Sequence, residues 1–120
     1  MKHPKTMAVN NESDIVLLRL HVRDLARAIG MNLADQARIS LAASSVAKAI
    51  GLSAAHHGSV TIDDCCCDER TGVRVICTGK NGKTAHASDT LGDVRWMVDE
   101  LAFEVSPSHE VQVTLVKWRE

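Results

Sequence analysis

The chain has 120 residues, of which 45% are hydrophobic and 24% charged, and its formal net charge is −1. This length suits a single hydrophobic core, and the near-neutral charge gives no general attraction to nucleic acid or to anionic membranes. Two Trp and one Phe are too few for a platform on which bases stack, so nucleic-acid binding is not expected.

The first helix is predicted after a polar N-terminal stretch. Residues 1–13 are expected to form a flexible tail, followed by a single domain over residues 14–120. Ser13 is a suitable N-cap and Gly30 a suitable C-terminal stop. Between them, apolar residues recur at steps of three and four, the spacing of an amphipathic helix: Ile15, Leu18, Val22, Leu25 and Ile29.

A second helix is predicted over residues 33–50. Asn32 and Asp35 are spaced as in a capping box at its start. Gly51 is suited to end it, or Gly58 if the last turn runs on through Ala54 and Ala55. Its apolar stripe contains several small side chains, which let another element approach closely. The stripe consists of Ile39, Ala42, Ala43, Val46, Ala49 and Ile50.

The hydrophobic pattern then changes to a period of two, which predicts strands. Residues 59–67 and 73–78 are expected to form a β-hairpin around the turn-rich segment 68–72. A loop is predicted from Gly79 to Thr90.

Apolar residues at helical spacing predict a third helix over residues 90–101, and alternation predicts a final strand over residues 111–118. The resulting order is α-α-β-β-α-β. Helices on one face of a mostly antiparallel sheet are the economical packing for this order. We therefore expect an α+β fold, a two-layer α/β sandwich.

Several segments, in order, resemble the small GHKL-type (Bergerat fold) serine kinases of anti-sigma and stressosome systems, most closely the RsbT-like switch kinases. The family opens its two helices with Asp-Ile-Val and Asp-Gln-Ala-Arg-Ile, which stand here at residues 14–16 and 35–39. It ends in a similar helix, strand and Lys-Trp close, matched here by residues 94–101 and 116–118. The resemblance implies a GHKL ATPase-type sandwich, with ATP and Mg²⁺ as the family's cofactors.

The family's ATP site is the part that does not match. The family places a carboxylate general base on the second helix and, one turn later, an Asn that holds Mg²⁺. Aligned on residues 35–39, these positions fall on Ser45 and Ala49. Loss of a general base alone costs about 10²–10⁴ in rate. Loss of the metal ligand also removes charge neutralisation on the phosphates.

The family's adenine-reading motif, Asp-x-Gly-x-Gly, is also incomplete here. Residues 78–83 retain Gly79 and Gly82 but lack the Asp, and the glycine-rich lid is shortened to residues 84–92. The vestigial pocket would consist of Ser45, Ala49, Gly79 and Gly82.

The resemblance, with this degenerate site, implies a non-catalytic regulatory protein that binds a partner stoichiometrically and needs no cofactor. The partner would be a STAS-domain protein, a sigma factor or a phosphatase regulatory segment. An active ATP-dependent serine kinase with a rearranged site stays open as an alternative. A homodimer also stays open, because some relatives dimerise.

The run Cys65-Cys66-Cys67 suggests a second alternative, a cysteine-based redox or metal sensor. Neighbouring strand residues point to opposite faces, so Cys65 and Cys67 share one face. A hairpin closing symmetrically around Arg70 would place Cys77 on that same face. Zinc sites use short spacers between paired ligands, which this run lacks, so buried thiols are expected instead of a metal site. If the three thiols Cys65, Cys67 and Cys77 did bind a metal, the fourth ligand would be His56, His57 or His86.

Localisation and two surface features complete the expectations. The N-terminal stretch lacks the apolar run of a signal peptide, and no window approaches about 20 apolar residues, so we expect a cytoplasmic protein that does not cross a membrane. Its cysteines are then expected to be reduced. Trp118 suits either a docking anchor or a cap on the core. A solvated helix face or a site for an acidic partner fits Arg19, Arg23 and Arg27.

Overall fold

The computed structural model describes residues 4–50, 58–80, 91–108 and 110–119. Its elements, in chain order, are β1 (Lys5–Val9), α1 (Glu12–Ala28), α2 (Leu33–Ala49), β2 (Gly58–Cys67), β3 (Arg70–Lys80), β4 (Glu100–Val105) and β5 (Glu110–Trp118).

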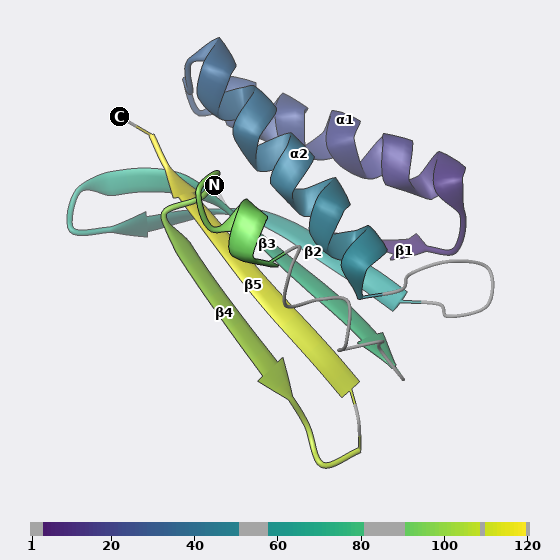
Figure 1. Cartoon of the computed structure of the whole chain (residues 1–120). Helices are drawn as coiled ribbons and strands as arrows, with labels where there is room; N and C mark the ends of the chain where they lie inside the picture. The colour runs from purple at the N-terminus through teal and green to yellow at the C-terminus, as the bar shows by residue number, and fades with distance from the viewer. Residues whose placement is uncertain (1–3, 51–57, 81–90, 109, 120) are drawn as a thin grey trace.

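The strands form one antiparallel sheet in the order β1-β2-β3-β5-β4, and both helices lie on one of its faces (Figure 1). The expected α+β fold with a helix layer on a sheet is confirmed. Within the described residues, no helix is long and apolar enough to cross a membrane.

The two predicted helices are present, and each begins at an asparagine cap. The Asn32 side chain accepts a hydrogen bond from the Asp35 amide (2.8 Å), as the predicted capping pattern requires. At α1 the cap is Asn11, which accepts from the Asp14 amide (3.0 Å), so this helix begins earlier than Ser13. Helix α1 buries one stripe against the sheet: Ile15, Leu18, Val22 and Ala26.

The core lies between the helix layer and the inner face of the sheet. Both helices pack on β3, while α1 also contacts β1 and β2 and α2 contacts β5. Each fully buried Val, Leu or Ile contributes about 1.5–3 kcal/mol through removal of apolar surface from water. The sheet contributes a continuous buried row from three strands: Val60, Ile62, Val73, Val75, Cys77, Val111, Val113 and Leu115.

The N-terminal stretch differs from the expected flexible tail. Residues 5–9 form β1, which pairs antiparallel with residues 58–62 of β2. Val9 is fully buried, Met7 packs against the core, and the Thr6 hydroxyl lies 3.0 Å from that of Thr61. Two inward apolar side chains among polar neighbours suffice for an edge strand.

The predicted third helix is wrong beyond its first turn. Residues 91–94 are helical, but the chain then turns, and the Met97 amide donates to the Val94 carbonyl (2.8 Å). From Glu100 onward the chain forms β4 and pairs with β5, so Leu101 packs against the core from a strand. The observed order therefore contains β1 and β4, which the prediction lacked.

Candidate functional site

The positions that correspond to the family's base and Mg²⁺ ligand lie in the second half of α2. Ser45 and Ala49 are one turn apart, share a helix face and are half-buried. The neighbouring Ser44 is buried, and its hydroxyl donates to the Leu41 carbonyl (3.0 Å). The only carboxylate on α2 is Asp35, in its first turn. The second half of this helix therefore offers no carboxylate that could act as the general base.

The remaining pocket residues do not complete an ATP site. Gly79, predicted in a loop, lies inside β3, where it is buried and paired with Gly58 and Val111. The prediction of a loop beginning at Gly79 is therefore wrong. Gly82 and most of the shortened lid lie outside the described residues.

A group of charged side chains gathers at the other end of α2, and we call Asp35, Arg38, Asp99 and Lys117 the anchor cluster. The Asp35 side chain is only 2% exposed. Its Oδ1 lies 2.9 Å from Arg38 Nη1 and 3.7 Å from Lys117 Nζ. Lys117 Nζ also lies 3.5 Å from Asp99 Oδ1.

The anchor cluster joins three segments that are distant in sequence. Asp35 and Arg38 belong to the Asp-Gln-Ala-Arg-Ile segment, Asp99 to the stretch before β4, and Lys117 to the Lys-Trp close. These are three of the segments that carry the family resemblance. Among the described residues, no buried side-chain polar atom lacks a hydrogen-bond partner. The cluster is thus internally satisfied, which suits a structural role.

Trp118 is held tightly beside this cluster, on the sheet face opposite the helices. Its backbone amide donates to Asp99 Oδ2 (2.7 Å) and its indole Nε1 donates to Glu100 Oε2 (2.8 Å). The guanidinium of Arg70 stacks over the ring, 4.3 Å from its centroid. Trp118 also lies against Gly72, where an added Cβ would approach ring atom Cε3 to 2.8 Å.

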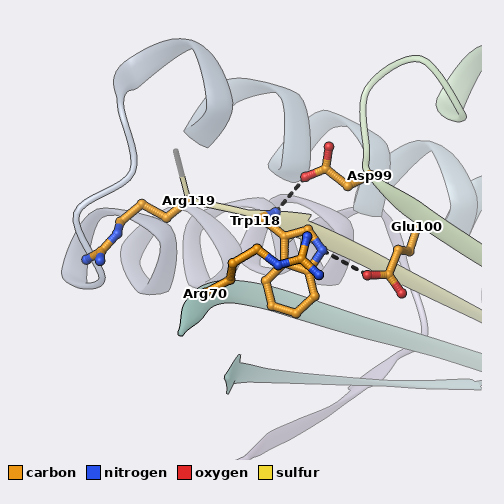
Figure 2. A pocket seen from close by; sticks show the side chains of 5 residues that line it. All are labelled: Arg70, Asp99, Glu100, Trp118 and Arg119. Carbon is orange, nitrogen blue, oxygen red and sulfur yellow. Dashed lines mark hydrogen bonds between the residues drawn. The ribbon is translucent and has the colours of Figure 1, made fainter. Parts of the chain in front are cut away.

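A hollow of about 340 Å³ lies beside this tryptophan, and Figure 2 shows the side chains that line it. The side chain of Arg119 extends away toward the loop after α1, where Nη1 donates to the Ile29 carbonyl (2.9 Å). The indole N–H, the backbone amide and one ring face of Trp118 already have partners within the protein. The lining of the hollow consists of Arg70, Asp99, Glu100, Trp118 and Arg119.

The cysteines do not gather as the sensor hypothesis required. The hairpin closes at Asp68 and Glu69, which have φ of 51° and 69°, and the register pairs Cys77 with Val60. Alternation then places Cys77 on the helix-facing side of the sheet, opposite to Cys65 and Cys67. The predicted shared face is therefore wrong, because the turn centre differs from Arg70.

The four thiols have different surroundings. Cys77 is fully buried, and this burial raises its pKa to about 12. Burial also raises the pKa of Cys65, against the opposing effect of Arg74. Cys66 and Cys67 are exposed near the hairpin turn. Within the described ranges, no group of three or more His, Cys, Asp or Glu is arranged to hold a metal ion.

One further charged pair lies on the open sheet face. Arg74 donates to both oxygens of Asp63, through Nε (3.0 Å) and Nη2 (2.7 Å). The hydrogen bonds to Asp63 raise the pKa of Arg74, as expected for a charge-assisted bidentate pair. The pair joins β2 to β3 and has no ligand-binding geometry of its own.

The remaining sequence candidates are divided between the surface and the undescribed segments. Arg19, Arg23 and Arg27 are all exposed on α1, and Arg27 pairs with Asp24 (2.8 Å). The histidines proposed as ligands, His56, His57 and His86, lie outside the described residues. Sequence reasoning missed the anchor cluster, although its members stand in the segments that carried the resemblance. No protein-family model matches the chain, and no curated protein matches it either.

Proposed function

We propose that this chain is a non-catalytic regulatory protein of the cytoplasm that acts by stoichiometric binding in a partner-switching pathway. It resembles a serine switch kinase or anti-sigma factor of the GHKL type whose phosphoryl transfer has been lost. By that resemblance, its partner is a STAS-domain protein, a sigma factor or a phosphatase regulatory segment. The observation that supports the proposal best is the second half of α2, where Ser45 and Ala49 offer neither a general base nor a metal ligand.

Phosphoryl transfer depends on positioned metal ions and on a group that orients the nucleophile, because there is little covalent chemistry for the protein to do. A helix with serine and alanine at these positions supplies neither. In contrast, the segments that resemble the family contribute to the anchor cluster, which ties α2 to β5. A chain that has the scaffold without the reacting groups is suited to binding.

Calorimetric titration of the full chain with Mg-ATP and with Mg-ADP tests this proposal. We expect no heat of binding up to millimolar nucleotide. A serine kinase with the complete motif set, titrated in parallel, verifies that such heats are detectable. Binding tighter than ~100 µM, about −5.5 kcal/mol, would instead support the alternative of an active serine kinase with a rearranged site.

The cysteine-sensor alternative is favoured by one observation, the exposure of Cys66 and Cys67 near the hairpin turn. Thiol titration of the folded protein should therefore modify these two, and Cys77 only after unfolding. Reactivity alone does not make a sensor. The alternative requires oxidation by a peroxide to change the fold or the assembly, as measured by circular dichroism and sedimentation, and it fails if neither changes.

A further inference from the structure

The two edges of the sheet are protected very differently. β1 begins after Pro4, has Lys5 hydrogen-bonded to His21 of α1 (3.1 Å), and lies in contact with that helix. Proline and lysine on an edge strand, and a covering helix, are the usual means of preventing further strand pairing. In the part of the chain that the structure describes, β4 has none of these three: it contains neither Pro nor Lys, and it lies beyond the two helices (Figure 1).

The side chains of β4 form two chemically distinct rows. Its register with β5 places Leu101, Phe103 and Val105 on the helix-facing side, opposite Leu115, Val113 and Val111. Phe103 is 37% exposed and Val105 48% exposed, although both are large and apolar. The other face of the strand presents Glu100, Ala102 and Glu104.

A second copy of the chain is a poor occupant of this edge. If two β4 strands paired antiparallel with Ala102 opposite itself, each Glu100 would face a Glu104, and like charges directly opposite are destabilising. With Phe103 opposite itself, Glu104 would face Ala102, but four carboxylates would still share one face of the two strands. An extended segment with cations on that face would complement the charge.

We infer that the outer edge of β4, with which no described strand pairs, is a docking site for an extended segment of a partner protein in which apolar and basic residues alternate. The backbone of that segment would add a sixth strand beside β4, a recognised mode of peptide binding. Its apolar side chains would cover Phe103 and Val105, and its Lys or Arg side chains would lie beside Glu104. The inference rests on the proposed function, since it names the surface by which this regulator holds a partner.

The test is a titration of the ¹⁵N-labelled full chain with two short synthetic peptides. One alternates Lys with Val, and the matched peptide has Glu in place of each Lys. We expect the Lys peptide to shift the backbone amides of residues 100–105 and the Glu peptide to leave them unchanged. Glu104→Lys should weaken binding of the Lys peptide by at least about tenfold, because it opposes like charges.

Glu69→Lys is the matched control, because it makes the same charge change at the exposed β2–β3 turn. Its affinity for the Lys peptide should stay within about twofold of the wild-type affinity, because salt screens the added charge at a distance from β4. Glu104 is preferred to Glu100 for the test, since the Glu100 carboxylate accepts the hydrogen bond of Trp118.

Several outcomes would overturn the inference. The first is that the Lys peptide shifts only backbone amides outside β4, or shifts no β4 amide at about 1 mM peptide, the limit of weak binding. The second is that the Lys and Glu peptides bind equally well. The third is that Glu104→Lys and Glu69→Lys weaken binding of the Lys peptide equally. Protection of β4 amides that rises with protein concentration would assign this edge to a second copy. If the peptide does not bind β4 and calorimetry detects no nucleotide binding, the docking site is wrong and the proposed function still stands. If calorimetry detects nucleotide binding, the proposed function is wrong, whatever the peptide titration shows.

Discussion

The two ends of α2 differ more in chemistry than in shape. At its start, the buried carboxylate of Asp35 has two cationic neighbours, Arg38 and Lys117. In its second half, Ser45 and Ala49 supply neither a carboxylate nor an amide oxygen, and the ionisable side chain there is Lys48, in the last turn. Both ends belong to one regular helix with a continuous buried face. The helix therefore carries charged contacts to other segments at its start, and at Ser45 and Ala49 it lacks the side chains that the resemblance would require for phosphoryl transfer.

This difference separates two reasons for a family resemblance. Residues that hold the fold are expected to persist whether or not a reaction takes place, because a buried unpaired charge is costly. Residues that perform a reaction have no such reason to persist once the reaction is lost. The resemblance in the anchor cluster therefore supports a similar fold. It does not support a similar activity, which depends on the side chains at Ser45 and Ala49.

The largest expected effect comes from Lys117→Met, which removes the cation between Asp35 and Asp99. Breaking a buried ion pair by removing one partner costs about 3–5 kcal/mol. Because Asp99 is partly exposed and Arg38 stays beside Asp35, we expect the free energy of unfolding to fall by about 3 kcal/mol, the low end of that range. Urea unfolding followed by circular dichroism measures this loss.

Arg19→Met is the matched control for the loss of a cation. Arg19 is exposed on α1 and has no ion-pair partner among the described residues, so the change should stay within about 0.5 kcal/mol. A loss of less than about 1 kcal/mol in Lys117→Met would show that the anchor cluster behaves like surface ion pairs. The contrast between the two ends of α2 would then disappear.

The next effect concerns Gly72, which lets the end of β5 approach β3. A Cβ at this position would lie 2.6 Å from the Lys117 carbonyl oxygen and 2.8 Å from the Trp118 ring. Backbone cannot move aside cheaply, so Gly72→Ala should destabilise the fold by about 2 kcal/mol, within the range for overpacking. In a Trp96→Phe background, Trp118 fluorescence should report the displaced ring.

Gly92→Ala provides the control for adding a methyl group. Gly92 is exposed, and a Cβ there would meet nothing within 4 Å, so this variant should be as stable as the wild type or slightly more stable. If Gly72→Ala were equally harmless, the close contact of Trp118 with β3 would not contribute to holding the anchored end.

The helices and the central strands could be predicted because their patterns are long. α1 and α2 each run for 17 residues with a clear buried stripe, and β2 and β3 alternate around a turn. The edge strands are short and mostly exposed, so few of their residues report on burial. In β4, Leu101 also continues the helical spacing of Val94, Met97 and Val98, and pairing with β5 decides against the helix.

The site could be predicted only where it depends on residue identity. That Ser45 and Ala49 lack the family's chemistry follows from the sequence alone. The contact of Asp35 with Lys117 joins residues far apart in the chain, and no local spacing predicts it. The position of Cys77 depended on the turn centre, and a shift in that centre moved it to the other face of the sheet.

The pH dependence of the unfolding free energy tests the burial of Cys77 in the core, away from the anchor cluster. Cys77 lies four residues along β3 from Val73, the strand partner of Lys117. Burial raises its pKa from 9.0 in the unfolded chain to about 12. The unfolded state therefore loses its proton first, so this stability is complete below about pH 9 and is lost as the pH rises toward 12.

Between pH 8 and pH 10, the wild type should lose about 1 kcal/mol more than Cys77→Val, since one pH unit above the unfolded pKa is worth about 1.4 kcal/mol. Urea unfolding of both proteins at both pH values isolates this thiol from the lysines, which titrate in both. Equal losses would mean that the thiolate is tolerated, and hence that water reaches this part of the sheet.

The smallest expected change in stability comes from a double variant that directly removes the difference between the two ends of α2. Ser45→Glu with Ala49→Asn introduces, at these half-buried positions, the residue types of the kinase family that the chain resembles. The unfolding free energy should change by less than about 1 kcal/mol, mostly from the lower helix propensity of Asn. We expect no binding of Mg-ATP by calorimetry, because residues 78–83 still lack an Asp to read adenine and Gly79 lies within β3.

Binding tighter than ~100 µM in this double variant, about −5.5 kcal/mol, would contradict that expectation. It would mean that two side chains account for the whole loss and that the rest of an ATP site persists in the fold. Silence in a variant that unfolds like the wild type would mean that the bare end of α2 is one part of a wider loss. In that case the anchor cluster would serve to hold the helix on the sheet, and the proposed regulator would act through its surface.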